Sequence, residues 1–385
     1  MSDLTPLSLY VHWPFCLAKC PYCDFNSHVR DEIPHERFTA ALKQELASDA
    51  ARTGRRPLRS IFFGGGTPSL MKPETVATLI EDARQLFDAP DDLEITLEAN
   101  PTSVERGKLA AFREAGVNRV SLGIQSLDEG ALRFLGREHS ASQAIAALET
   151  ARTLFPRLSF DLIYARPEQT LAAWEAELHR ALDLASDHLS LYQLTIEQGT
   201  KFEGLYRQGQ FVLPENDDAA LLYEKTAEIA AEHGLIDYEI SNYARPGAES
   251  RHNLTYWRYQ DYIGIGPGAH GRLTLEGALH ATRRHRAPEI WADRVEQRGN
   301  GSTEEVPLSV EERGREALLM GLRLREGIAL DWFAERSGRP LEACVDPVIL
   351  EAALAEGYLI QTDQRLIATN EGRVRLEALL GALVL

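Results

Sequence analysis

Short apolar runs alternate with longer amphipathic stretches along the first half of the chain. Six runs have the length and spacing of buried strands, at residues 7–12, 60–63, 94–98, 119–124, 159–164 and 188–194. Stretches with a helical period lie between them, at residues 38–51, 73–87, 104–115, 141–154 and 171–185. Strands that alternate with helices predict a parallel α/β architecture, either an open sheet or a barrel.

Polar residues and glycines gather where these predicted strands end. Cysteines follow the first strand, and Gly64-Gly-Gly-Thr-Pro68 follows the second. Glu98 ends the third strand, Gln125 follows the fourth, and Asp161 lies within the fifth. Because active sites of parallel α/β barrels are built from the carboxyl ends of the strands, this pattern favours a barrel.

The rest of the chain has a different pattern. A second region begins near Pro214 with a predicted helix at 217–233 and continues through a section rich in glycine and aromatic residues. From about Pro307 the pattern predicts a small, mostly helical domain, whose tail at 356–369 resembles the hairpin of a winged-helix fold. We therefore predict three parts, comprising residues 1–213, 214–305 and 306–385.

Composition excludes several classes of function. The 385 residues carry a formal net charge of −17, and the clearest basic cluster is the short segment 283–286. This argues against a nucleic-acid partner, since phosphate binding draws on clustered cations. We see no signal peptide at the start and no apolar run near the roughly 20 residues that span a bilayer. We expect a soluble, cytoplasmic protein.

Three of the four cysteines fall within eight positions, at Cys16, Cys20 and Cys23. Thiolates this close can converge on one face of an iron–sulfur cluster. Structural zinc normally takes four ligands, and His28 is the nearest candidate for the fourth. Three cysteines on a four-iron cluster would leave one iron open to an outside ligand. The alternative is three incidental thiols in a reducing cytosol.

The C-x3-C-x2-C spacing, preceded by Tyr10-Val-His-Trp-Pro-Phe15, resembles the signature of radical S-adenosylmethionine proteins. Within that superfamily the chain resembles the branch that holds oxygen-independent coproporphyrinogen III oxidase and the HemW-type heme chaperones. The resemblance spans nearly the whole chain, from Leu9 to the C-terminal domain. It implies an incomplete six-stranded parallel barrel, a [4Fe-4S] cluster on the three cysteines, and S-adenosylmethionine on the open iron.

The same resemblance assigns S-adenosylmethionine contacts to nine residues. Gly65, Gly66 and Thr67 match the loop that receives the amino group of the cofactor. The other six are Tyr10, Tyr22, Glu98, Gln125, Arg137 and Asp161. By residue type alone, the glycine loop would serve equally well as a tight turn. One departure concerns Ala165-Arg-Pro-Glu-Gln169, where the family usually has a Gly-Leu-Pro turn, and it leaves the shape of that loop open.

Two features separate the oxidases of this branch from the chaperones. The oxidases carry a further cysteine two positions after the third one, where this chain has Phe25. His252-Asn-Leu-Thr-Tyr-Trp257 resembles a motif that is tied to heme binding in the chaperones, which makes His252 the candidate heme ligand. A histidine among aromatic residues is more often a packed, hydrogen-bonded residue, and His270 is a second candidate.

The sequence therefore favours a heme chaperone that binds heme and transfers it to acceptor hemoproteins, such as those of the respiratory chain. The alternative is a coproporphyrinogen III oxidase that cleaves S-adenosylmethionine reductively, with the radical chemistry belonging to the cofactor. A redox or iron sensor is a third hypothesis. The sequence does not settle the oligomeric state, and a homodimer is one option.

Overall fold

The computed structural model describes residues 5–103 and 106–385, and its core is one twelve-stranded sheet. The parallel strands, in spatial order, are β11 (Asp261–Ile265), β1 (Leu7–Trp13), β4 (Leu58–Gly65), β5 (Glu94–Ala99), β6 (Arg119–Gln125), β7 (Arg157–Tyr164) and β8 (His188–Gln193). All six predicted strands are present, with ends that differ from the prediction by at most two residues. The predicted parallel α/β architecture is confirmed.

Strand β11 differs from the prediction, because it is a seventh parallel strand. It pairs with β1 in register from Leu7 opposite Asp261 to Val11 opposite Ile265. Its sequence lies in the section rich in glycine and aromatic residues, which has the pattern of a loop. β11 therefore covers the edge of β1 that a six-stranded barrel would leave open.

Antiparallel strands extend the sheet on both sides. Beyond β11 lie β12 (His270–Leu275), β13 (Ala278–Arg284) and β14 (Ser302–Pro307), and beyond β8 lie β10 (Asn242–Ala244) and β9 (Ile236–Asp237). Among the described residues β14 and β9 are the two ends of the sheet, so the barrel is open. Strands from the segment predicted as a separate middle part thus belong to the same sheet as the first part, and the predicted domain boundaries stay a prediction.

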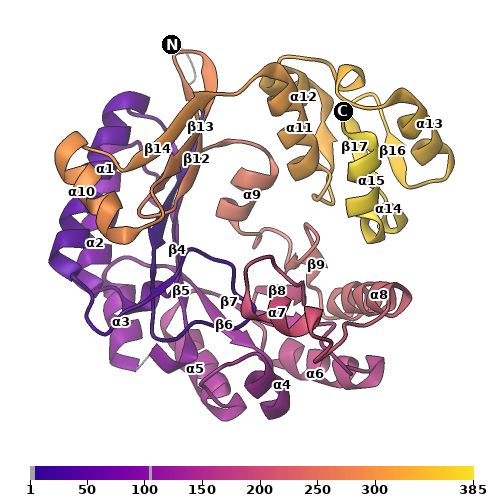
Figure 1. Cartoon of the computed structure of the whole chain (residues 1–385), viewed down its shortest axis with the longest axis horizontal. Helices are drawn as coiled ribbons and strands as arrows, with labels where there is room; N and C mark the ends of the chain where they lie inside the picture. Colours follow the sequence, from indigo (N-terminus) through magenta and orange to yellow (C-terminus); the bar gives the residue numbers. More distant parts are fainter. Residues whose placement is uncertain (1–4, 104–105) are drawn as a thin grey trace.

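Helices cover the outer face of the curved sheet (Figure 1). They are α1 (His35–Thr53), α2 (Pro73–Leu86), α3 (Arg106–Glu114), α4 (Glu129–Phe134), α5 (Ala141–Leu154), α6 (Leu171–Leu184) and α8 (Asn216–Glu232). In α2 the buried residues Val76, Leu79, Ile80 and Ala83 form one face, which is the spacing expected for a helix packed on a sheet. The first two positions of the helix predicted at 104–115 lie outside the described residues.

Shorter elements complete this part of the chain. They are the strands β2 (Phe15–Cys16) and β3 (His28–Val29), the single turns η1 (Pro68–Leu70) and η2 (Pro101–Ser103), and the helices α7 (Lys201–Arg207), α9 (Arg251–Trp257) and α10 (Pro288–Arg298). In Figure 1 helix α9 lies inside the curve of the sheet, on the side opposite the outer helices. Strand β2 ends at Cys16, the first of the three cysteines, so β1 and β2 lead the chain directly into the candidate site.

The C-terminal domain has a core of its own, which includes Leu318, Leu322, Phe333, Leu366 and Leu383. Its elements are α11 (Val310–Gly321), β15 (Ile328–Ala329), α12 (Leu330–Ser337), η3 (Leu341–Ala343), α13 (Pro347–Ala355), β16 (Leu359–Gln361), β17 (Arg365–Ala368), α14 (Asn370–Val374) and α15 (Leu376–Leu383). β16 and β17 form the predicted hairpin, and β15 pairs with β17 to give a three-stranded antiparallel sheet. The small, mostly helical domain is confirmed, and its order of elements is that of a winged helix.

A buried carboxylate joins this domain to the barrel. Asp261, at the start of β11, pairs with Arg56 at 2.7 Å and with Arg336 of α12 at 2.5 Å. Burial alone would raise the pKa of this carboxyl, yet the two guanidinium groups hold it below its ordinary value. The C-terminal domain is thus tied to the sheet beside its first parallel pair. In the described part of the chain no helix is long and apolar enough to cross a membrane.

Candidate cofactor site

The three cysteines lie in a loop that leaves the carboxyl end of β1. Cys16 ends β2, and the amide of Cys23 donates to the carbonyl of Cys20 at 3.2 Å, which closes the loop. All three thiols are half-buried, and burial raises the pKa of Cys16 and Cys23. Neighbouring cysteines raise these two pKa values further, as expected for sulfur atoms that face a common space.

Two donors point at these sulfur atoms. The Thr67 hydroxyl donates to Sγ of Cys16 at 3.4 Å, and the Arg137 guanidinium donates to Sγ of Cys20 at 3.3 Å. Both contacts favour the thiolate, which is the form that binds iron. No three His, Cys, Asp or Glu side chains of the described residues surround one point that suits a single metal ion. Three cysteine thiolates in one loop are a donor set that a four-iron cluster takes, with each cysteine on a different iron.

The glycine loop is held tightly against this segment. The amides of Gly66 and Thr67 donate to the carbonyls of Trp13 and Phe15 at 2.7 and 2.8 Å. A Cβ on Gly66 would lie 2.7 Å from the Phe15 carbonyl oxygen, so only glycine fits here. Since an ammonium group donates hydrogen bonds, its contacts with this loop would fall to carbonyl oxygens.

Two carboxyl groups project from the inner face of the sheet. Burial, and then the charge of Asp161, raise the pKa of Glu98 on β5 to about 8, although the amide of Gly65 donates to Glu98. Burial raises the pKa of Asp161 on β7 to about 6, even though Ser190 and Ser121 donate to it. Both pKa values would fall on binding a cation. This pair therefore suits a positively charged ligand such as a sulfonium or an ammonium group.

Gln125, Arg137 and Tyr22 form the other side of the site. Gln125 ends β6 with φ of 70°, at the point where the register of β6 and β7 shifts. Arg137 donates to the Gly123 carbonyl at 2.7 Å, and it also hydrogen bonds to Tyr22 next to Cys20. A small cavity of about 20 Å³ is lined by Cys20, Thr67 and Arg137 together.

A larger cavity of about 560 Å³ opens beside these residues. Tyr10, Gly65 and Glu98 are among its lining residues, so the cavity shares part of its wall with the predicted S-adenosylmethionine contacts. Aromatic side chains form much of the remaining wall, namely Phe25, Tyr256, Trp257, Tyr259 and Tyr262. The volume lies in the range of about 300–1,000 Å³ that is typical of small-molecule sites.

The predicted cluster and S-adenosylmethionine residues come from β1, β2, β4, β5, β6 and β7 and from the loops that follow β2, β4 and α4, and Tyr10 and Asp161 lie within their strands rather than at the ends. Three of the predicted residues line the larger cavity and three line the small one. Sequence patterns did not indicate the wall that the C-terminal domain contributes, which includes Glu316 and Met320 of α11. These residues have the ordinary pattern of an amphipathic helix, and only the packing of the domain places them here. The roles assigned to the individual site residues stay predictions.

His252, the candidate heme ligand, lies outside this cavity. Its side chain is 1% exposed and stacks on Phe62 with ring centroids 4.7 Å apart. Nδ1 is hydrogen bonded to the Ser60 hydroxyl at 2.9 Å, and Nε2 is hydrogen bonded to the hydroxyl of Tyr256. Burial lowers the pKa of the ring to about 3, so it is neutral. Iron ligation by His252 would require it to give up one of these two bonds.

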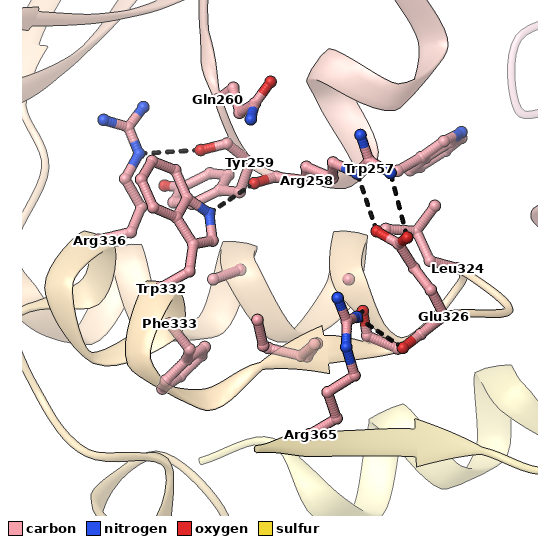
Figure 2. A pocket seen from close by; sticks show the side chains of 15 residues that line it. Trp257, Arg258, Tyr259, Gln260, Leu324, Glu326, Trp332, Phe333, Arg336 and Arg365 are labelled. Carbon is pink, nitrogen blue, oxygen red and sulfur yellow. Dashed lines mark hydrogen bonds and ion pairs between the residues drawn. The ribbon is translucent and has the colours of Figure 1, made fainter. Parts of the chain in front are cut away.

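A smaller cavity of about 190 Å³ adjoins the larger one between α9 and the C-terminal domain (Figure 2). Trp257, Tyr259 and Gln260 line both cavities, so this segment is their common wall. Figure 2 shows how the C-terminal domain holds it: Trp332 donates to the Arg258 carbonyl and Arg336 to the Tyr259 carbonyl, both at 2.8 Å. The buried indole N–H of Trp257 has no acceptor among the described residues.

Comparison with known proteins agrees with the fold and identifies the family. Residues 10–181 match the Radical SAM superfamily, and residues 308–375 match the HemN C-terminal domain. In structure the chain is similar to coproporphyrinogen III oxidase (HemN) from Escherichia coli, with a TM-score of 0.80 and 23% identity over 98% of this chain and 90% of that one. At this identity the similarity shows a shared fold.

Closer similarity in sequence is found with two groups of proteins. The heme chaperone HemW of Escherichia coli strain K12 is 37% identical over 99% of this chain and 98% of its own length. A mouse protein named radical S-adenosyl methionine domain-containing protein 1, mitochondrial, is 41% identical over 98% of this chain and 87% of its own. The chain therefore belongs to the radical S-adenosylmethionine superfamily, in the branch of HemN and HemW.

Proposed function

We propose that the protein is a heme chaperone, which binds heme in the larger cavity and passes it to acceptor hemoproteins. The observation that carries this proposal is the aromatic cavity of about 560 Å³ next to the cofactor residues. Phe25, which is 59% exposed, lines it at the position where the oxidases have a cysteine. An apolar ring system of the size of heme would find large flat side chains here. We place this transfer in the cytoplasm, with respiratory hemoproteins among the acceptors.

In this proposal Cys16, Cys20 and Cys23 hold a [4Fe-4S] cluster, with Thr67 and Arg137 stabilising two of the thiolates. S-adenosylmethionine would lie along the strand ends. Its carboxylate would face Arg137, its cationic groups would face Glu98 and Asp161, and the glycine loop and Gln125 would fix its orientation. When bound, the cluster supplies an open iron and one electron. Tyr10 and Tyr22 would close the site from the sides.

Coproporphyrinogen III oxidase activity is the second candidate. It is supported by the predicted cofactor residues that line the two cavities, which are Tyr10, Gly65 and Glu98 in the larger one and Cys20, Thr67 and Arg137 in the small one. An oxidase would use S-adenosylmethionine to take a hydrogen atom from a porphyrinogen propionate side chain. The chaperone would need the same cofactors only for structure or for controlled heme release.

One experiment separates the two candidates. Anaerobically reconstituted protein is given coproporphyrinogen III, a reductant and S-adenosylmethionine, and the decarboxylated product is measured. A parallel sample is titrated with heme and followed by its Soret band. We expect stoichiometric heme binding and no product. Multiple turnovers of coproporphyrinogen would contradict the chaperone proposal, and failure to bind heme would remove it.

A further inference from the structure

Three histidines lie in or directly behind the larger cavity, and their ring nitrogens differ in availability. His252 uses both nitrogens in hydrogen bonds inside the core. His12 lines the cavity, but its Nδ1 is hydrogen bonded to the Tyr10 hydroxyl at 3.0 Å and its Nε2 to the Asn26 carbonyl at 2.9 Å. Neither ring can offer a lone pair to a metal without losing a bond that holds a buried polar group.

His270 is different. It lies at the start of β12, lines the cavity with an exposed side chain, and has no hydrogen-bond partner for its ring within the described residues. Its backbone is held by the β12–β13 pairing opposite Arg283, and its carbonyl oxygen lies so close to Gly264 that a Cβ there would come within 1.9 Å of it. Burial, and then Arg283, Arg272 and Arg286, lower the pKa of the ring. The neutral imidazole, which is the form that binds iron, therefore predominates at neutral pH.

Positive charges surround this histidine at the mouth of the cavity. Arg283 stands directly opposite His270 across the β12–β13 pair, and Arg286 follows two residues after the end of β13. Both line the cavity and are exposed. Arg272 is bound by Glu316 through two hydrogen bonds, whereas no carboxylate of the described residues pairs with Arg283 or Arg286. In a chain with a net charge of −17, two unpaired guanidinium groups beside a cavity suit an anionic ligand.

We propose that His270 is an axial ligand to the iron of heme bound in the larger cavity, and that Arg283 and Arg286 pair with its propionates. The proposal rests on the proposed function and assigns to it a binding site and a ligand. Heme has three parts that match three parts of this cavity. Its flat apolar ring can pack on the aromatic wall, its iron can bind the imidazole, and its two propionates can pair with the guanidinium groups.

The first test compares ferric heme binding by the reconstituted full chain, by His270→Ala and by His280→Ala. His280 is a matched control, because it lies on the neighbouring strand β13 and does not line the cavity. We expect His270→Ala to bind heme at least tenfold more weakly, with a shifted Soret band and a changed ferric heme EPR signal. Added imidazole should restore the signal. His280→Ala should match the wild type.

The outcomes distinguish the two levels of the proposal. Wild type that binds no heme would remove the heme chaperone proposal itself. Wild type that binds heme with the same affinity and EPR signal as His270→Ala would leave heme binding intact and overturn the assignment of His270.

A second test concerns the arginines, through the double variant Arg283→Ala/Arg286→Ala. We expect it to weaken the binding of heme severalfold, and to leave the binding of heme dimethyl ester, which lacks the propionate charges, as in the wild type. Equal losses for heme and for the ester would overturn the propionate contacts.

Discussion

Gly66 lies so close to the backbone of Phe15 that a side chain there would collide with a carbonyl oxygen. The Gly66→Ala variant should therefore move the glycine loop away from the cysteine segment and lower the free energy of unfolding by about 1–3 kcal/mol. S-adenosylmethionine binding should weaken with it. Gly107→Ala is a matched control, because nothing lies within 4 Å of a Cβ at Gly107 on α3, and it should change stability by no more than about 1 kcal/mol. Urea unfolding of both variants checks this, and equal stability would contradict the packing argument.

Glu98 makes stability depend on pH in the absence of ligands. Its folded-state pKa of about 8 lies above the ordinary value, so the folded protein keeps a proton that the unfolded chain has lost. Stability from this group is present below about pH 4.3 and is lost as pH rises through about 8. In Glu98→Gln we expect a flatter decline of the melting temperature between pH 5 and 8. Glu36→Gln is the control, because Lys72 lowers the pKa of this exposed residue, which titrates below that range. If the melting temperature of Glu98→Gln declines with pH as steeply as that of the wild type, the raised pKa of Glu98 is not the cause of the decline.

At the scale of elements, Arg336 of the C-terminal domain holds the segment between α9 and β11 through two contacts. Arg336 of α12 donates to the Tyr259 carbonyl and pairs with the buried carboxylate of Asp261. Arg336→Met should lower the free energy of unfolding by about 3 kcal/mol, since it leaves Asp261 with one guanidinium group instead of two. Arg339→Met, which removes the exposed pair with Glu311, should cost less than about 1 kcal/mol. Thermal unfolding of both variants tests the difference, and similar losses would contradict it.

Elements differ in how far the sequence predicts them. The six predicted strands are parallel and covered on their outer face, so their apolar runs predict them within two residues; they are β1, β4, β5, β6, β7 and β8. The sequence does not predict β11 as a strand, because Asp261 and Gly264 interrupt its apolar pattern. Asp261 is compatible with a buried strand only through arginines that come from far away in sequence. Such pairs leave no local pattern.

The candidate site shows the same division. The cysteines, the glycine loop and the residues at the strand ends follow from spacing and family resemblance. The burial of His252 depends on Ser60 and Phe62 of β4, and the availability of His270 depends on what the neighbouring strands leave unpaired. Both are results of tertiary packing, which residue type and spacing do not encode.

At the scale of the whole molecule, the larger cavity lies between the sheet and the C-terminal domain. Heme bound there should stabilise both sides together, by about 2.7 kcal/mol at a free concentration of 100 times Kd. We expect hydrogen exchange to slow on heme binding in residues 256–262 and also in α11, which carries Glu316 and Met320. The outer helix α5 is the internal control and should not change. Protection confined to one side would place heme elsewhere.

The pairing of β1 with β11 also has a consequence during synthesis of the chain. Leu7 of β1 can pair with Asp261 of β11 only after Asp261 has left the ribosome. At about 5–20 residues per second this takes roughly 10 to 50 s, during which one edge of β1 has no partner strand. Exposed strand edges attract other chains, so the newborn protein is vulnerable to aggregation for that time. The cysteine loop and Phe25 emerge early in this interval, long before Tyr256, Trp257, Tyr259 and Tyr262, which complete the aromatic wall of the cavity.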